Sequence, residues 1–289
     1  MPHSPRFLLY CTKIVTMRIQ RIERLNPDAA DVEARAFIRE VERHFSHEGK
    51  TIYKARNEIK VIGRYNVKKF GVPNFFNRVV YASLRNPKAI RAYENALSLL
   101  RMGIPTPVPF GIVMLRTGWT LGESYLITEQ LPLGRSMYEF GHTDHRADTK
   151  EVLQSFGRFT AMLHDRGVLH LDYSPGNILF DRNDDGTYSF ALVDVNRLRF
   201  SSKPVPLSEG VRNMRRLWGD PPVLREIAFA YAEARHTDPN DVFSLLSKAH
   251  ASFWKGRDTR WIHTPWNERD AKRVPMMSHS TVVEGAEIK

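Results

Sequence analysis

The stretch from His170 to Asn177 constrains the fold of this chain more than any other part of the sequence. It places His170 two residues before Asp172 and Asn177 five residues after it, so that three polar side chains share one tight loop. The apolar residues 178–180 follow directly and predict a strand. A polar loop that runs straight into a strand is well placed to present its side chains together.

A second strand is predicted over Tyr188 to Val193, beyond the turn-rich residues 181–186. Two strands joined by a turn that contains Asp-Gly form a β-hairpin. The hairpin returns Asp194, which follows the second strand, to the side of Asp172 and Asn177. Two carboxylates and one amide oxygen then converge, and such hard ligands suit Mg²⁺ held against phosphates. A plain hairpin with acidic and amide caps at its ends is the alternative interpretation.

The spacing His-x-Asp-x4-Asn, followed by a hairpin and a second aspartate, matches the catalytic loop and metal-binding aspartate of the protein-kinase-like fold. The match implies that Asp172 receives the proton of a substrate hydroxyl. It also implies that Asn177 and Asp194 hold metal, while His170 orients the backbone of the loop.

Upstream, three short segments rich in β-branched and aromatic residues predict an antiparallel sheet over residues 51–54, 59–62 and 65–70. In a kinase-like small lobe, the third strand carries a lysine that pairs with the nucleotide phosphates. The pattern apolar-x-apolar-Lys favours Lys68 over Lys69, and only one of the two can face a cleft because strand side chains alternate. A solvated pair of strand lysines is the alternative.

A helix is predicted from about Pro87 to Met102, opened by Asn86-Pro87 and closed by Gly103. Within it, Glu94 is the candidate for an ion pair that would fix Lys68 against the phosphates. An ordinary surface glutamate is the competing interpretation.

The proline-rich residues 103–109 cannot continue the helix. Strands are then predicted over residues 111–115 and 124–128, around a turn at Gly118 and Gly122. Residues 129–132 leave the sheet and form the expected hinge between two lobes. The backbone of Glu129 and Leu131 is expected to take the adenine edge, an assignment made from position alone.

Helical periodicity predicts further helices over residues 31–45, 152–166, 207–218, 223–233 and 241–254, while residues 17–29 look irregular. The expected fold class is therefore α+β, with a small antiparallel-sheet lobe that has one main helix and a larger, mostly helical lobe. The expected domains are an N-terminal extension (1–46), a kinase-like N-lobe (47–130), a kinase-like C-lobe (131–263) and a flexible tail (264–289).

Charge and composition describe a globular, basic protein. Lys and Arg number 43 against 32 Asp and Glu, an excess of 43 − 32 = 11, which suits an anionic membrane, an acidic substrate or nucleic acid without choosing among them. The single cysteine, Cys11, excludes an internal disulfide. Residues 7–11 make a poor signal peptide, Met17 is an alternative start, and no apolar run approaches a membrane span. A cytoplasmic protein is expected.

Aromatic and basic residues interleave between Gly71 and Arg91. Such a segment can bind lipid headgroups or stack on nucleic acid. Aromatic packing beneath the sheet, with the charges facing water, is the more ordinary interpretation.

These residues together resemble the lipopolysaccharide core kinases, bacterial kinase-fold enzymes that phosphorylate inner-core Kdo or heptose sugars. The similar segments are the catalytic loop and residues 65–70, 92–100, 103–107 and 192–197. The resemblance implies ATP and Mg²⁺ as cofactors, an anionic sugar or glycolipid acceptor, and peripheral contact with the inner membrane as an open alternative. A monomer is expected, with no nucleic-acid partner.

Several positions depart from the protein-kinase pattern. No Gly-x-Gly-x-x-Gly precedes Lys68, and only Gly49 and Gly63 are available. Ser174 stands where many protein kinases have lysine, and the short segment after Asn196 lacks the peptide-docking platform. The rival functions are a kinase of another small molecule or of protein, and a catalytically silent scaffold, which the missing glycine loop favours.

Overall fold

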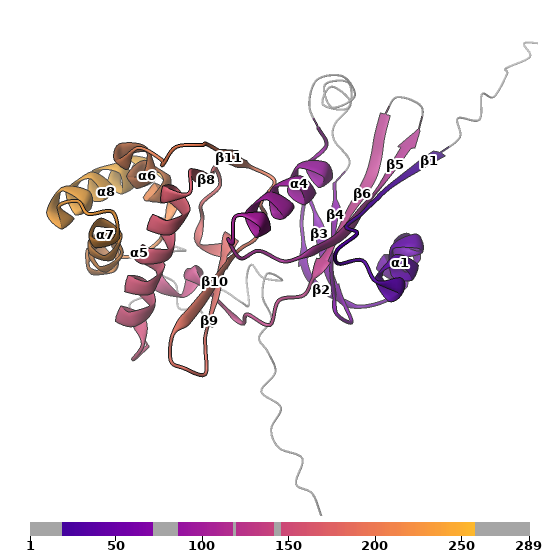
Figure 1. Ribbon diagram of the computed structural model, residues 1–289, viewed down its shortest axis with the longest axis horizontal. Helices are drawn as coiled ribbons and strands as arrows, with labels where there is room; N and C mark the ends of the chain where they lie inside the picture. Colours follow the sequence, from indigo (N-terminus) through magenta and orange to yellow (C-terminus); the bar gives the residue numbers. More distant parts are fainter. Residues whose placement is uncertain (1–18, 72–85, 118–119, 142–145, 258–289) are drawn as a thin grey trace, which may run out of the picture.

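The computed structural model describes residues 19–71, 86–117, 120–141 and 146–257. A sheet-based N-terminal lobe is followed by a mostly helical C-terminal lobe (Figure 1). The predicted α+β, two-lobed fold is thereby confirmed. The aromatic and basic stretch is described only at its ends, and Cys11, Met17 and the tail from residue 264 lie outside the described ranges.

The N-lobe is built on an antiparallel sheet with the strand order β1-β5-β6-β4-β3-β2. The strands are β1 (Ile19–Leu25), β2 (Lys50–Lys54), β3 (Glu58–Ile62), β4 (Tyr65–Phe70), β5 (Pro109–Thr117) and β6 (Thr120–Glu129). All five predicted strands are confirmed. Gly122 lies within β6 rather than at the turn, and Gly118 falls outside the described residues.

Two expectations for the first part of the chain are wrong. Residues 19–25, expected to be irregular, form the edge strand β1, which pairs with residues 111–117 of β5. Its side chains are mostly exposed, so the strand depends on backbone pairing and carries little hydrophobic alternation. The single helix expected over 31–45 is two, α1 (Val32–Arg39) and α2 (Val41–His47), separated at Glu40.

Helices cover both faces of the sheet (Figure 1). On one face, α1 and α2 bury Phe37, Ile38 and Phe45 against strand residues such as Val67 and Val113. On the other face lies α4 (Lys88–Arg101), the predicted main helix. This face includes Ala89, Ala92 and Tyr93 with Phe70, Ile112 and Leu126.

Helix α4 also enters the core of the C-lobe. Its last two turns contribute Ala96 and Leu99 to that core, joined by Ile104 just beyond the helix. The proline-rich linker then bonds to strand β10 (Tyr188–Leu192): the Thr106 hydroxyl donates to the Leu192 carbonyl (2.7 Å), and the Leu192 N–H donates to the Pro105 carbonyl (3.0 Å). The linker therefore ties α4 to the strand that precedes Asp194.

The C-lobe is a layer of helices beneath short strands. Its helices are α5 (Thr149–Asp165), α6 (Leu207–Asn213), α7 (Pro221–Ala234) and α8 (Pro239–Trp254), with the 3-10 turns η1 (Met137–Gly141), η2 (Pro175–Asn177) and η3 (Met214–Arg216). The short strands are β7 (Arg135–Ser136), β8 (Val168–His170), β9 (Ile178–Arg182), β10 and β11 (Leu198–Phe200). The predicted hairpin is confirmed as β9 and β10, in antiparallel register.

Helices α5 and α7 pack closely at Gly157. A Cβ atom there would lie 2.6 Å from the Ile227 carbonyl oxygen and 2.9 Å from the Ala230 Cβ. Alanine at Gly157 should therefore lower the free energy of unfolding by about 1–3 kcal/mol through overpacking, although alanine is the better helix former. Urea denaturation would measure this change. Lys150→Ala, at an exposed position of the same helix, is the control, and a more stable Gly157→Ala protein would contradict this packing.

Candidate active site

A cleft of about 520 Å³ is lined by both lobes. This size is within the usual range for small-molecule sites. Its walls include five of the residues selected from the sequence, namely Lys68, Glu129, Leu131, Asn177 and Asp194. Apolar side chains of β3 and β9, including Val61 and Leu179, supply surfaces on which a flat ring could pack.

Lys68 and Asp194 form an ion pair across the cleft. The Lys68 Nζ lies 2.6 Å from the Asp194 Oδ1, and the lysine side chain is only 12% exposed. Lys69 points to the other face of β4, where its Nζ lies 2.5 Å from Glu123. Strand alternation thus sends Lys68, and not its neighbour, into the cleft.

The Asp194 carboxyl is held in its ionised form. Burial alone would raise the pKa of this carboxyl, but the charge of Lys68 and hydrogen bonds from Lys68 and Asn196 outweigh burial and lower the pKa overall. The residue also has a φ of 53°, in the left-handed region that costs energy for a residue with a Cβ. Strain of this kind is concentrated at functional sites, where the surrounding structure enforces it.

The catalytic loop is tied to the end of the hairpin. The Asn177 side-chain N–H donates to the Asp172 carbonyl (2.9 Å), and the Val193 N–H donates to the Asn177 carbonyl (3.0 Å). The Asn177 amide oxygen accepts no hydrogen bond from the described residues, and Asn177 borders the cleft with Asp194. Both residues therefore offer oxygen atoms on the same side of the cleft.

His170 is a structural link in this loop. Its Nδ1 accepts from the Asp172 N–H (3.1 Å), which leaves Nε2 to donate to the Val193 carbonyl (3.2 Å). The ring is buried, and burial lowers the pKa of the imidazole, so the neutral form is favoured. These contacts fit an orienting role for His170.

A second buried histidine supports the loop from below. The His164 Nδ1 lies 2.9 Å from the Tyr231 hydroxyl and its Nε2 lies 3.4 Å from the Asn213 side-chain oxygen. Asn213 in turn donates to the His170 carbonyl (2.9 Å). The neutral His164 ring, which burial favours, fits this chain of donors and acceptors.

Asp172 lies outside the lining of the cleft, and its carboxylate is paired with the guanidinium of Arg216, from η3. The sequence interpretation did not select Arg216. The signal available to it was the run of basic residues at Arg212, Arg215 and Arg216, which lies far from the loop along the chain.

The predicted Lys68–Glu94 ion pair is wrong. Glu94 pairs with Arg24 of β1 at 2.8 Å, and its side chain is 45% exposed. On α4 the residues that line the cleft are Ala92 and Ala96, and a position two residues away from either lies about 200° around the helix. Glu94 therefore faces away from the cleft.

A polar residue on α4 that reaches the site is Asn95, which the sequence interpretation missed. Its side-chain N–H donates to the Val195 carbonyl (2.7 Å), directly after Asp194. The short Ala-x-x-x-Ala spacing of residues 92 and 96 was the available signal for the face of α4 that points inward.

The turn between β2 and β3, where a kinase glycine loop would stand, is Ala55-Arg56-Asn57. Gly49 precedes β2 and Gly63 joins β3 to β4, so neither lies at this turn. Burial, and then repulsion from Arg56 of this turn, lower the pKa of Lys88 on α4, while Asp194 opposes the shift.

The hinge has a backbone donor turned away from the sheet. The Glu129 N–H bonds to the Val108 carbonyl (2.8 Å) and the Gln130 N–H to the Arg64 carbonyl (2.9 Å). The Leu131 N–H has no backbone acceptor within the described ranges. Leu131 also lines the cleft, so its amide can receive the edge of a base.

The oxygen donors of Asn177 and Asp194 fit Mg²⁺ bound together with phosphates. Mg²⁺ usually takes one or two protein carboxylates and completes its shell with substrate phosphates and water. No cluster of three or more His, Cys, Asp or Glu side chains suited to a metal occurs in the described part of the chain. The oxygen atoms of Asn177 and Asp194 are compatible with that mode of Mg²⁺ binding.

The fold and this arrangement of Lys68, Asp194, Asn177 and Asp172 define a phosphotransferase of the protein-kinase-like class. A family model for the lipopolysaccharide kinase (Kdo/WaaP) family matches residues 48–218, more than half of the chain. The chain belongs to the lipopolysaccharide kinase (Kdo/WaaP) family. The resemblance inferred from the sequence is thereby confirmed.

A solved structure with a TM-score above 0.5 supports the fold. The chain is similar to WaaP in complex with acyl carrier protein, with a TM-score of 0.52 and 16% identity over 81% of this chain and 98% of that one. It is also similar to the Rio2 kinase–ADP/Mg²⁺–phosphoaspartate complex from Chaetomium thermophilum (TM-score 0.42, 13% identity, 77% and 71% covered). WbdD bound to a kinase inhibitor matches with a TM-score of 0.40 and 18% identity (73% and 48% covered). No curated protein sequence matches the chain.

The buried His164 should make stability depend on pH. Burial lowers the pKa of His164 to about 4 in the folded protein, against about 6.5 in an unfolded chain. The unfolded state therefore binds the extra proton first as pH falls. The contribution of His164 to the free energy of unfolding is fully present above about pH 6.5. It decreases as the pH falls toward 4, by at most about 3 kcal/mol.

Denaturant unfolding between pH 4 and 7 would test this dependence. His164→Gln should unfold at lower denaturant at pH 7 yet lose less stability on acidification than the parent. Part of the slope should persist because burial also lowers the pKa of His170 and His250. His47→Gln, at an exposed position, is the control. Parallel pH profiles for His164→Gln and the parent would contradict the assignment.

Proposed function

We propose that the protein transfers the γ-phosphoryl group of ATP to a hydroxyl of an inner-core Kdo or heptose sugar of lipopolysaccharide, with Mg²⁺. The observation that carries this proposal is the Lys68–Asp194 pair at 2.6 Å in a cleft that also presents Asn177 and the hinge. Family membership supports the sugar kinase class. ATP, Mg²⁺ and the particular sugar are the finer parts of the proposal.

Each residue of the cleft has a task in nucleotide binding. The backbone of Glu129 and Leu131 takes the adenine edge, and Lys68 binds the phosphates. Asn177 and Asp194 would hold Mg²⁺, which when bound neutralises phosphate charge. Glu94 has no part in this arrangement because it pairs with Arg24.

The acceptor hydroxyl is placed by Asp172. Its carboxylate orients the hydroxyl and takes the proton as the new oxygen–phosphorus bond forms and the bond to the ADP oxygen breaks. His170 keeps the loop in register, and catalysis rests mainly on positioning and charge neutralisation.

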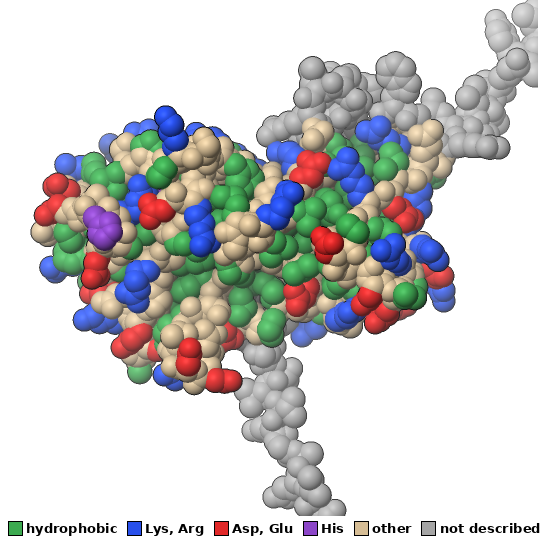
Figure 2. Space-filling view, in the orientation of Figure 1, with side chains coloured by type: hydrophobic (Ala, Val, Ile, Leu, Met, Phe, Trp, Pro, Cys, Tyr) green, Lys and Arg blue, Asp and Glu red, His purple; other side chains and the backbone are tan. Residues whose placement is uncertain are grey.

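Surface charge favours an acceptor that is already anionic. Basic residues exceed acidic ones by 11, and on the face shown in Figure 2 both kinds are interspersed over the two lobes rather than collected in one patch. Within the described ranges every helix is too short or too polar to cross a bilayer. We place the protein in the cytoplasm as a monomer, with peripheral contact at the inner membrane where its glycolipid acceptor resides.

The domain boundaries belong to the same proposal. Residues 47–130 and 131–263 would form the two catalytic lobes, preceded by an extension and followed by a tail. Residues before 48, where the family match begins, supply the edge strand β1 of the sheet and the helices α1 and α2 that cover it.

A catalytically silent scaffold is the rival that the atypical β2–β3 turn favours. Mg-ATP should raise the melting temperature of a nucleotide-binding kinase, since a ligand that binds only the folded state stabilises it. A melting temperature that does not respond to millimolar Mg-ATP would favour the scaffold.

Asp172→Asn should lower turnover by about two orders of magnitude or more, because it removes the proton acceptor while keeping the shape of the side chain. The KM for ATP should change little, since Asp172 lies outside the cleft lining. Transfer from labelled ATP to lipopolysaccharide precursors, with a generic protein acceptor alongside, is the measurement. Full activity of Asp172→Asn would rule out this mechanism.

Lys68 and Glu94 should respond differently to substitution. Lys68→Met should abolish the Mg-ATP shift in melting temperature and most transfer, because the phosphates lose their cation. Glu94→Gln should retain both within about threefold, since exposed ion pairs contribute at most about 1 kcal/mol. Loss of nucleotide binding in Glu94→Gln would contradict this expectation and favour the Lys68–Glu94 ion pair predicted from the sequence.

A further inference from the structure

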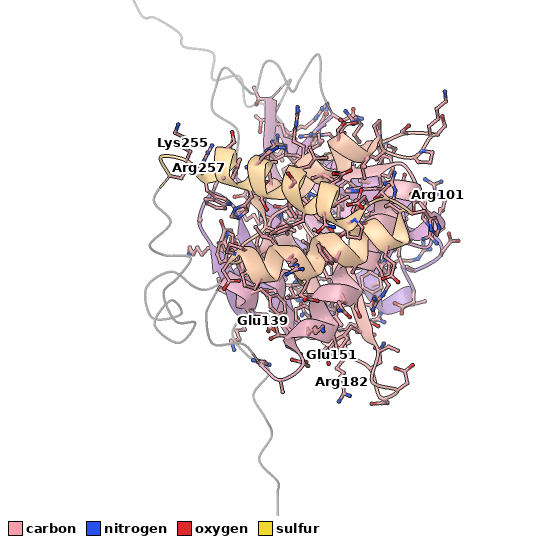
Figure 3. The ribbon with its side chains drawn as sticks, turned by 90° about the vertical axis from the view of Figure 1, so that its left-hand side faces the viewer. Arg101, Glu139, Glu151, Arg182, Lys255 and Arg257 are labelled. Carbon is pink, nitrogen blue, oxygen red and sulfur yellow. The ribbon has the colours of Figure 1, made fainter. Side chains whose placement is uncertain are left out.

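Three arginines converge on one aromatic ring beside the catalytic loop. The guanidinium carbons of Arg257, Arg216 and Arg215 lie 4.1, 5.5 and 5.6 Å from the centre of the Phe253 ring. Arg212 lies alongside, and its carbonyl accepts from the Arg215 Nη1 (2.9 Å). These four arginines, from α6, η3 and the residues after α8, are called the arginine cluster; Figure 3 labels Arg257 near the end of α8.

Charge in the arginine cluster is poorly balanced by the residues that the structure describes. Arg216 pairs with Asp172, but no carboxylate within the described ranges lies at ion-pair distance from Arg212, Arg215 or Arg257. Other arginines of this lobe are matched, for example Arg235 with Asp165 at 2.8 Å. Burial, and then repulsion from the other three members, lower the pKa of the Arg215 guanidinium. Like charges held together at a cost are typical of a site that binds an anion.

The arginine cluster lies on the acceptor side of the catalytic loop. The residues that line the nucleotide cleft include Lys68, Asn177 and Asp194 but neither Asp172 nor any member of the cluster. Arg216 reaches the Asp172 carboxylate from η3, which packs against α8 in the C-lobe. An anion bound here would therefore be part of the molecule whose hydroxyl meets Asp172, and would not be a nucleotide phosphate.

We propose that the arginine cluster binds an oxyanion, a carboxylate or a phosphate, that the acceptor sugar carries before it is phosphorylated. The proposal rests on the proposed function, since it names the charge class of the acceptor. The Arg216 guanidinium can donate two hydrogen bonds to one oxyanion, and its side chain can rotate from Asp172 to the incoming anion. Once Arg216 binds the anion, the Asp172 carboxylate is released from its ion pair and can accept a hydrogen bond from the acceptor hydroxyl. Only an anionic acceptor therefore frees Asp172 completely.

Matched acceptors would separate charge from shape. The probes are a soluble Kdo-containing oligosaccharide, the same oligosaccharide with its carboxylates converted to methyl esters, and a phosphatase-treated sample. Transfer from labelled ATP should show at least a tenfold higher kcat/KM for the anionic form, as a charge-assisted hydrogen bond would give. Loss with the ester assigns a carboxylate, and loss after phosphatase treatment assigns a phosphate.

Substitutions in the arginine cluster should remove this preference. Arg215→Met should raise the KM for the anionic acceptor about tenfold or more and leave the KM for ATP unchanged. The variant should show nearly the same kcat/KM for the acid and for its ester. Arg216→Met should do the same, and Arg216→Lys should restore part of the preference. Arg225→Met is the matched control, because Arg225 also stacks on a phenylalanine, Phe229, but on α7.

A binding measurement keeps this inference distinct from the proposed function. Calorimetric titration of the oligosaccharide needs no phosphoryl transfer. Absent transfer with Arg215-dependent, salt-sensitive binding would defeat the proposed function and keep the anion site. An unchanged acid-to-ester ratio in Arg215→Met, or binding of the acid that Arg215→Met does not weaken, would overturn the anion site even in an active kinase.

Discussion

The ion pair between Lys68 and Asp194 is the contact on which the site depends. A buried charge is costly unless it is paired, so each residue holds the other in the cleft although they come from different lobes. The pairing fixes the end of β10 against β4 and keeps the Asp194 carboxyl ionised despite burial. Under the proposed function, Lys68 would bind the phosphates and Asp194 would bind the metal, so the two side chains would exchange each other for ligand. Their role is therefore in ligand binding more than in stability.

Around that pair, neutral histidines hold the catalytic loop. His170 bonds to the loop and to the strand before Asp194, while His164 and Asn213 support His170 from beneath. Both rings are buried, and burial favours the uncharged imidazole, which in His170 leaves Nδ1 free to accept the Asp172 N–H. The backbone of the loop is thus held by uncharged groups, while its Asp172 carboxylate is paired with Arg216.

Local patterns predicted the parts of the site whose positions follow from short-range geometry. The apolar-x-apolar-Lys pattern selected Lys68, and strand alternation meant that only one of the two lysines could face the cleft. The predicted hairpin returned Asp194 to the side of Asn177 because a tight turn between two strands allows few other arrangements. The prediction of an ion pair for Glu94 was wrong because a helix can turn any of its faces toward the cleft. Only the packing of α4 determines that Ala92 and Ala96 point inward. Strand β1 was missed because an exposed edge strand needs no apolar alternation. Arg216 reaches Asp172 only through tertiary folding, which no motif encodes.

Helix α4 is shared between two hydrophobic cores, with Ala92 and Tyr93 in one and Leu99 in the other. A rod embedded at both ends cannot swing outward without exposing apolar side chains to water, and the Thr106 bond to Leu192 resists the same movement. If the cleft opens, helix α4 therefore remains packed in both cores while the surrounding parts of the two lobes rotate about it. Activity would then be governed by what enters the cleft, and not by displacement of the helix.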